Sequence, residues 1–165
     1  MQNGIKNCKY TRTLLAGLAF GIIYFLVGGF VWGFLFGEET EKYANLWRDM
    51  NGEDRFPCIM MGIGSLLIGL ATACAYCKFY KGICGEGIKK GLFFGLKLWF
   101  IVGLGEGVHW FGVYPVSATL LGAFMLHKFL AFTVGGIVIA YIFGNLPETC
   151  GESCSIEKVS KKKKK

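Results

Sequence analysis

Apolar residues are gathered into four long stretches that short polar segments separate. The first stretch, Leu14 to Phe36, runs for 23 residues without a charged side chain. A helix needs about 20 such residues to cross the hydrocarbon core of a bilayer. We therefore predict an all-α, polytopic membrane protein with four transmembrane helices in a compact bundle, at about residues 13–37, 57–77, 87–107 and 117–144. Residues 1–145 form this four-helix transmembrane domain, and 146–165 form a disordered polar tail ending in a lysine run.

The charges of the connecting segments predict the orientation, because short cytoplasmic segments carry an excess of Lys and Arg. The N-terminal segment holds three bases and no acid, and the second connection holds four bases and one acid. The first connection holds six acids against three bases, and the segment between spans three and four has no Lys or Arg. Both termini are therefore expected in the cytoplasm. The first connection is long enough for a short amphipathic helix with Tyr43, Leu46 and Trp47 on one side.

The overall composition is typical of a membrane protein and indicates which kinds of partner to expect. Of the residues 53% are hydrophobic, and 25 are Gly against only 3 Pro, a usage typical of closely packed transmembrane helices. The net charge is +7, but five of these charges are the run Lys161 to Lys165. We expect this run to attract anionic lipid, at about 1 kcal/mol per basic residue near the surface. Nucleic-acid binding is not expected, because lipid-facing helices leave little surface for it. The first apolar stretch also exceeds the about 7–15 residues of the apolar region of a signal peptide, so we expect the first helix to be retained.

Glycines recur at four-residue spacing along two of the predicted spans. Small residues at this spacing form a groove in which another helix backbone can approach closely. The groove can serve contacts within the bundle or a homo-oligomer, and we favour contacts within the bundle. The predicted helix-packing glycines are Gly17, Gly21, Gly29, Gly33 and Gly37 on span one and Gly87, Gly91 and Gly95 on span three.

Ionisable side chains inside the spans are costly and therefore mark candidate sites. At about 100° per residue, His109 falls within about 60° of Glu106, on the glycine face of span three. Lys97 lies about 180° away, and we expect it to extend toward the cytoplasmic headgroups as an anchor. His127 and Lys128 on span four lean toward the end of span three, because helical side chains lean toward the N-terminus. The sequence thus predicts a polar cluster of Glu106, His109, His127 and Lys128 in the outer half of the bundle.

This cluster has a functional and a structural interpretation. It could relay a proton or ion, or bind a polar headgroup. Alternatively, a Glu106–Lys128 ion pair with satisfied histidines fixes the register of the helices. We favour the structural interpretation. The single Glu-x-x-His of Glu106 and His109 is insufficient for a di-metal centre, which uses two such motifs and two further carboxylates.

The chain has seven cysteines, and the predicted topology places most of them on the cytoplasmic side, where thiols stay reduced. Cys74 and Cys77 form a C-x-x-C that with Cys84 is a weak candidate for a zinc site. The spacing is not that of a zinc ribbon, so we expect small packed residues rather than a metal site. No cofactor and no catalytic residue is predicted.

Three segments carry a resemblance to known proteins. They are Phe25 to Gly37 (FLVGGFVWGFLFG), Gly91 to Trp99 (GLFFGLKLW) and His127 to Phe143, with the outer-loop Trp47 after the first. In the placement of Gly and aromatic residues, they resemble a group of small bacterial four-helix integral membrane proteins of unknown function. The resemblance implies the four-helix architecture and adds no chemistry.

The most economical expectation is a non-enzymatic accessory or interaction subunit, in the inner membrane of a bacterium, that contacts a membrane-protein partner or a second copy. A small oligomeric transporter or channel-like protein that uses the polar cluster is the second hypothesis. A membrane enzyme acting on a lipid or thiol substrate is the third. A eukaryotic protein would instead use the terminal lysines as a retrieval signal, but the bacterial resemblance argues against this alternative.

Overall fold

A computed structural model describes residues 2–44, 55–83 and 85–144, with side chains from Tyr10 onward. The elements are all helical. The long helices are α1 (Gln2–Gly29), α3 (Phe56–Phe79), α4 (Gly87–Leu98), α5 (Gly105–Val113) and α6 (Ala118–Phe143), and the short helix α2 is Gly37–Glu41. Two π-helical segments, η1 (Phe30–Leu35) and η4 (Trp99–Leu104), and a 3₁₀ turn, η3 (Tyr80–Gly82), complete the fold. The predicted 146–165 tail and the segment around Trp47 lie outside the described residues.

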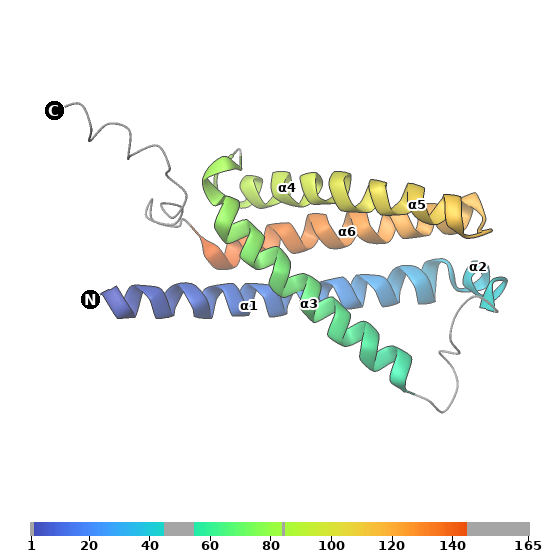
Figure 1. Cartoon of the computed structure of the whole chain (residues 1–165), viewed down its shortest axis with the longest axis horizontal. Helices are drawn as coiled ribbons and strands as arrows, with labels where there is room; N and C mark the ends of the chain where they lie inside the picture. Colours follow the sequence, from blue (N-terminus) through green and yellow to red (C-terminus); the bar gives the residue numbers. More distant parts are fainter. Residues whose placement is uncertain (1, 45–54, 84, 145–165) are drawn as a thin grey trace.

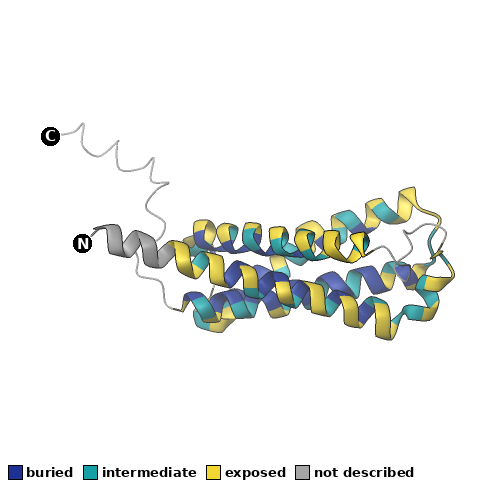
Figure 2. Cartoon of the chain, turned by 90° about the horizontal axis from the view of Figure 1, so that it is seen from below, coloured by how far each residue is buried: buried dark blue, intermediate teal, exposed yellow. Residues whose placement is uncertain are grey.

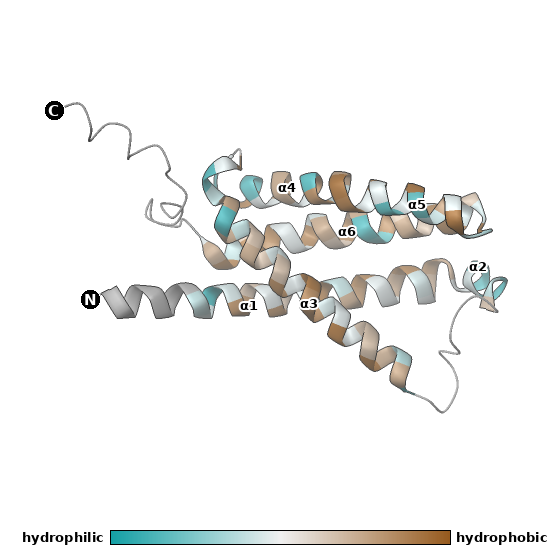
Figure 3. Ribbon diagram, viewed as in Figure 1, coloured by the Kyte–Doolittle hydropathy of each residue, from teal (hydrophilic) through white to brown (hydrophobic). Residues whose placement is uncertain are grey.

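Four of these helical runs are long and apolar enough to cross a membrane: Tyr10–Leu35, Phe56–Gly82, Gly87–Val113 and Ala118–Phe143. Figure 3 shows that apolar residues dominate all four, with polar residues gathered toward their ends and in a few places along α4 and α6. The prediction of an all-α protein with four membrane-spanning helices is therefore confirmed. The third span runs to Val113 rather than to Gly107, because α5 continues through Gly107 and Gly112 and the next proline is Pro115.

The spans are not arranged as a regular bundle. In Figure 1, α1, α6 and the α4–α5 pair run side by side, whereas α3 crosses α1 diagonally and leaves the other helices toward Phe56. The helix α6 packs between α1 and α4, and α3 packs mainly on α1. Figure 2 shows buried positions facing the inside of the bundle and exposed positions along its outside. The most continuous core therefore lies along α6, where Ala131, Ile139 and Phe143 are completely buried.

Glycines make the closest helix crossings. A Cβ added at Gly21 would lie 2.8 Å from the Leu66 Cα on α3, and one at Gly69 would clash with the backbone of α1. On the other side of the bundle, a Cβ at Gly95 would clash with the Phe132 carbonyl oxygen on α6, and Gly136 faces Gly91 in the same crossing. At these two crossings, α1–α3 and α4–α6, the backbones approach closely because the glycines carry no side chain there.

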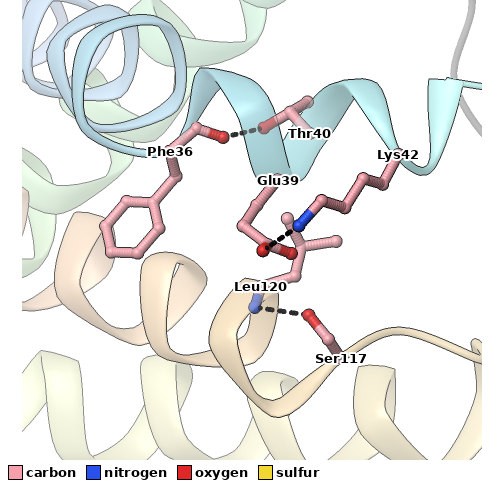
Figure 4. Close-up of polar contacts among 6 residues, drawn as sticks. All are labelled: Phe36, Glu39, Thr40, Lys42, Ser117 and Leu120. Carbon is pink, nitrogen blue, oxygen red and sulfur yellow. Dashed lines mark hydrogen bonds and ion pairs between the residues drawn. The ribbon is translucent and has the colours of Figure 1, made fainter.

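The two ends of the bundle are closed by different contacts. At the end where α1 enters and α6 stops, which we call the terminal end, the Arg12 Nη1 donates to the Phe143 carbonyl at 3.4 Å. A cation suits this position, because the last carbonyls of a helix lack partners within the helix. At the opposite end, the loop end, the Ser117 Oγ accepts from the Leu120 N–H at 3.1 Å and caps α6, as Figure 4 shows.

The helix α2 lies at this loop end beside the start of α6 (Figure 4). The Thr40 hydroxyl donates to the Phe36 carbonyl at 2.8 Å, and the Lys42 ammonium pairs with the Glu39 carboxylate at 2.5 Å. The Glu39 carboxylate raises the pKa of Lys42 above its usual value, chiefly through this hydrogen bond. Polar residues paired with one another thus follow directly after the first span.

The α4–α6 crossing makes a prediction about stability. Replacing Gly95 with Ala should lower the free energy of unfolding by about 1–3 kcal/mol, because the new methyl group forces the two backbones apart. Unfolding in detergent micelles, followed by tryptophan fluorescence, measures the change.

The matched control for this variant is Gly105→Ala on the same span, where an added Cβ meets no atom within 4 Å. It should be neutral or stabilising by up to about 1 kcal/mol, because Ala favours a helix over Gly. Equal effects of the two substitutions would contradict the close crossing.

Candidate functional site

The polar residues inside the membrane meet at the middle of α6. His127 and Lys128 are adjacent there, and each is only 8% exposed. Neighbouring residues on a helix point about 100° apart, so one side chain faces α1 and the other faces α5. The five residues that meet here differ from the predicted set. From here on, the polar cluster means Tyr24, Trp32, Glu106, His127 and Lys128.

Both ring nitrogens of His127 have a partner on the first span. The Trp32 Nε1–H donates to the His127 Nδ1 at 3.2 Å, and the His127 Nε2 lies 3.3 Å from the Tyr24 carbonyl oxygen. An indole nitrogen only donates and a carbonyl only accepts, so the two partners together select the neutral Nε2–H tautomer. The Tyr24 ring also lies 4.9 Å from the imidazole, centroid to centroid. The histidine is thus a polar link between α6 and the first span.

A glycine and a π-helical segment make room for this contact. A Cβ at Gly28 would lie 3.2 Å from the His127 Nε2, closer than such atoms normally approach. Trp32 lies in the π-helical η1, where the Phe36 N–H bonds the carbonyl of Val31, five residues earlier. A π-helical segment rotates the residues that follow it relative to an α-helix. Gly28 and η1 together therefore position the first span against the imidazole.

Lys128 points about 100° away from His127 around α6 and pairs with the third span. Its Nζ lies 3.1 Å from the Glu106 Oε2 and 5.4 Å from the centroid of the Tyr24 ring. The Lys128 side chain is 10% exposed and the Glu106 side chain is 39% exposed, so the carboxylate forms the outer edge of the pair. The base of Lys128 packs at η4, where a Cβ on Gly103 would be 3.4 Å from the Lys128 Cβ. This pair joins α5 to α6.

His109 is not brought into the cluster. It is exposed on α5, and within the described ranges no hydrogen bond or ion pair joins it to Glu106, His127 or Lys128. The buried residue of α5 is Gly107. At about 100° per residue, Glu106 points about 100° to one side of Gly107 and His109 points about 160° to the same side, so the 60° between them carries His109 out of the bundle. Lys97, on α4, is exposed as predicted.

A groove opens beside the histidine, between α1 and the diverging half of α3. Its empty volume is about 490 Å³, and its walls include Phe25, Trp32, Met61 and Ser65 with His127 among them. The lining is almost wholly apolar, because the Trp32 and His127 nitrogens bond each other and the Ser65 hydroxyl donates to the Met61 carbonyl at 2.8 Å. The groove is therefore suited to aliphatic chains of the bilayer.

The predicted packing glycines fall into two groups. Gly17, Gly21, Gly91 and Gly95 lie at the helix crossings. At the other four, Gly29, Gly33, Gly37 and Gly87, an added Cβ meets no atom within 4 Å. Gly87 instead begins α4 with a φ of +50°, a conformation that favours glycine.

The cysteines of the C-x-x-C lie at the end of α3. Cys74 is exposed and Cys77 is buried, and Cys84 lies outside the described residues. In the part of the chain that the structure describes, no group of three or more His, Cys, Asp or Glu side chains is arranged to hold a metal ion. The geometry thus offers no built metal site among these residues.

Comparison with known proteins adds no relative: no protein family, no curated protein and no solved structure matches this chain. The resemblance of the three glycine-rich segments to a bacterial group therefore stays a prediction. The site residues that sequence reasoning missed are Tyr24, Gly28 and Trp32. The only sequence signal for these residues is the indole N–H of Trp32, which needs a hydrogen-bond acceptor inside the membrane. The sequence does not show which residue supplies that acceptor.

The partners of His127 predict its tautomer. In ¹⁵N spectra of histidine-labelled protein in bilayers, His127 should carry its proton on Nε2 with Nδ1 unprotonated. Trp32→Phe removes the donor to Nδ1 and should shift the Nδ1 resonance, whereas the exposed His109 serves as an internal control that Trp32→Phe leaves unchanged. A protonated Nδ1 in the wild-type protein would contradict the geometry.

The ion pair predicts a rescue. Glu106→Gln should destabilise the protein by about 2 kcal/mol, because it leaves the buried Lys128 ammonium unpaired, although partial exposure of residue 106 reduces the loss. Adding Lys128→Met should restore most of the stability, since an apolar side chain replaces a buried ion pair at little cost.

Unfolding in micelles measures both variants of the ion pair. Glu39→Gln, in the pair with the exposed Lys42, is the matched control and should leave stability unchanged. A double variant that is no more stable than Glu106→Gln alone would show that Lys128 and Glu106 are not coupled.

Proposed function

We propose that this protein is a non-enzymatic accessory or interaction subunit of a membrane, which associates with another membrane protein through its lipid-facing surface. The observation that carries this proposal is the internal satisfaction of the polar cluster. His127 bonds Trp32 and the Tyr24 carbonyl, and Lys128 pairs with Glu106. Polar groups that have partners within the bundle hold its helices in register and leave none for a substrate.

The outer surface supports the same role. In the half of the bundle nearer the loop end, α3 leaves α1 and exposes apolar side chains of its own, including Ile59, Met60 and Ile63 (Figure 1). The open glycines Gly29 and Gly33 lie on the neighbouring part of the first span. A surface with small residues beside large apolar ones allows close packing of a further transmembrane helix.

The proposed membrane and orientation of this subunit rest on the distribution of charged residues and on the resemblance to small bacterial membrane proteins. An excess of basic residues at the terminal end supports a cytoplasmic location for both termini, and the resemblance of Phe25 to Gly37 favours the inner membrane of a bacterium. The lysine run Lys161 to Lys165 would then add attraction to anionic lipid on the same side. The bilayer itself is the first partner, since all four spans face it.

A small oligomeric transporter is the second candidate, and one observation favours it. The Glu106 side chain is 39% exposed and follows directly after the π-helical segment η4, a kind of irregularity that is frequent at functional sites. A second copy that covered Glu106 would enclose a carboxylate in the membrane. Transport of protons or cations would then depend on this residue.

Native mass spectrometry of the protein, extracted with its own membrane into lipid nanodiscs, separates the two candidates. The subunit proposal expects a fixed one-to-one mass with another polypeptide. A defined homo-oligomer without another protein would contradict it and favour transport. In that case, Glu106→Gln combined with Lys128→Met, which keeps the fold, should abolish a flux into proteoliposomes.

A further inference from the structure

Lys97 is a charge inside the membrane that the bundle does not use. It lies near the end of α4, and it is exposed on the outside of the bundle. Within the described ranges, no ion pair or hydrogen bond joins it to another residue. The four spans contain one acidic residue in total, Glu106, and its carboxylate already pairs with Lys128. Lys97 therefore has no carboxylate left within the spans of its own chain.

The position of Lys97 along the span places its ammonium below the headgroups. Lys90 marks the terminal end, where its Nζ lies 3.7 Å from the centroid of the Tyr80 ring. Lys97 is seven residues farther along α4, or about 10.5 Å at 1.5 Å per residue. An extended lysine side chain reaches back about 6 Å. The ammonium thus stays about one helical turn on the hydrocarbon side of Lys90, where an unpaired charge is unfavourable.

The surface around Lys97 is an apolar helix face without a neighbour. Phe93 precedes it by one turn, and Phe100 and Ile101 follow it on the same face at 67% and 70% exposure. Gly105 continues this face one turn later, and an added Cβ there meets no atom within 4 Å. The face therefore offers one cation, large apolar side chains and a small residue at a spacing that suits a crossing helix.

A second copy of this chain does not supply the missing charge. In a copy with the same orientation, Glu106 is nine residues farther along the span, which is about 13.5 Å from the depth of Lys97 at 1.5 Å per residue. No other Asp or Glu lies within the four spans. A complementary carboxylate within the spans therefore has to come from a different polypeptide.

We propose that the face formed by Phe93, Lys97, Phe100, Ile101 and Gly105 docks a transmembrane helix of another protein that carries an Asp or Glu at the depth of Lys97. This inference rests on the proposed function as an interaction subunit and names the chemistry of its partner. The ion pair forms in a medium without water, so it specifies both the partner and the register of the contact.

The test uses the full-length protein in phosphatidylcholine vesicles and synthetic transmembrane helices as probes. Each probe is a Leu/Ala helix with one Glu, placed either at the depth of Lys97 or nine residues farther along, and a third probe has Gln at the matching depth. Energy transfer from a donor on the protein to an acceptor on the probe reports association. The matching Glu helix should associate about tenfold more strongly than the other two, as a polar interhelical contact in a bilayer predicts.

Three variants make this assignment specific. Lys97→Met should reduce association of the matching Glu helix to that of the Gln helix, and Lys97→Arg should keep it. Lys90→Met, which removes a lysine at the terminal end of the same helix, should leave it unchanged. Each variant is first shown to unfold at the wild-type midpoint, so that lost association is not lost folding.

Equal association of the Glu and Gln helices, or strong association with Lys97→Met, would overturn the proposal. Equal association together with a deeper position of span three in Lys97→Met, measured by quenching with lipid-borne spin labels, would assign Lys97 to headgroup anchoring instead. The proposed function is tested separately by the native mass. If the protein prefers the matching Glu probe but no other polypeptide co-purifies with it, only the proposed function is contradicted. If a partner co-purifies but the protein shows no preference for the Glu probe, only this inference is contradicted.

Discussion

Two adjacent polar side chains in the middle of α6 must find partners where the bilayer supplies no water, and much of the bundle is arranged around this constraint. His127 takes its partners from the first span, and Lys128 takes its partner from the third. Because the two residues point to different sides of α6, each bond joins another helix to it. The helix α6 is consequently the most buried of the spans and lies between α1 and α4. If both positions were apolar, only the fit of the helix surfaces would determine which helices lie next to α6.

Close backbone contacts at glycines hold the helices together in addition to the polar bonds. The crossings at Gly21 and Gly69 and at Gly95 and Gly136 bring helix axes close, which in lipid is the main attractive term between apolar helices. The π-helical segments adjust the phase of two spans between these crossings and the polar cluster. On the first span, η1 holds Trp32, which donates to His127, and on the third span η4 directly precedes Glu106, which pairs with Lys128. The irregular segments thus lie next to the residues that make the polar bonds.

The contrast between paired polar groups inside the bundle and unpaired features outside it makes the outer surface informative about function. The charged and ring-nitrogen groups of the polar cluster are paired within the bundle. Among the described residues, several features without an internal partner face the lipid: the diverging half of α3, the open Gly29 and Gly33, and the charge of Lys97. In a protein of four spans, surface of this kind is most simply used for contact with another membrane helix.

The sequence by itself determined the membrane class, the number of spans and the ends of most of them, because bilayer thickness imposes a length and an apolar composition that can be counted. It also identified Glu106, His127 and Lys128, since charges in a span are rare and expensive. Only the tertiary structure decided that His109 stays outside, that Trp32 and the Tyr24 carbonyl hold the imidazole, and that Gly28 makes room for it. The physical reason is that the packing of the helices decides which side of each span is buried, and the π-helical segments η1 and η4 have no signature in hydropathy. The partner of each polar group is a long-range contact, which no local pattern encodes.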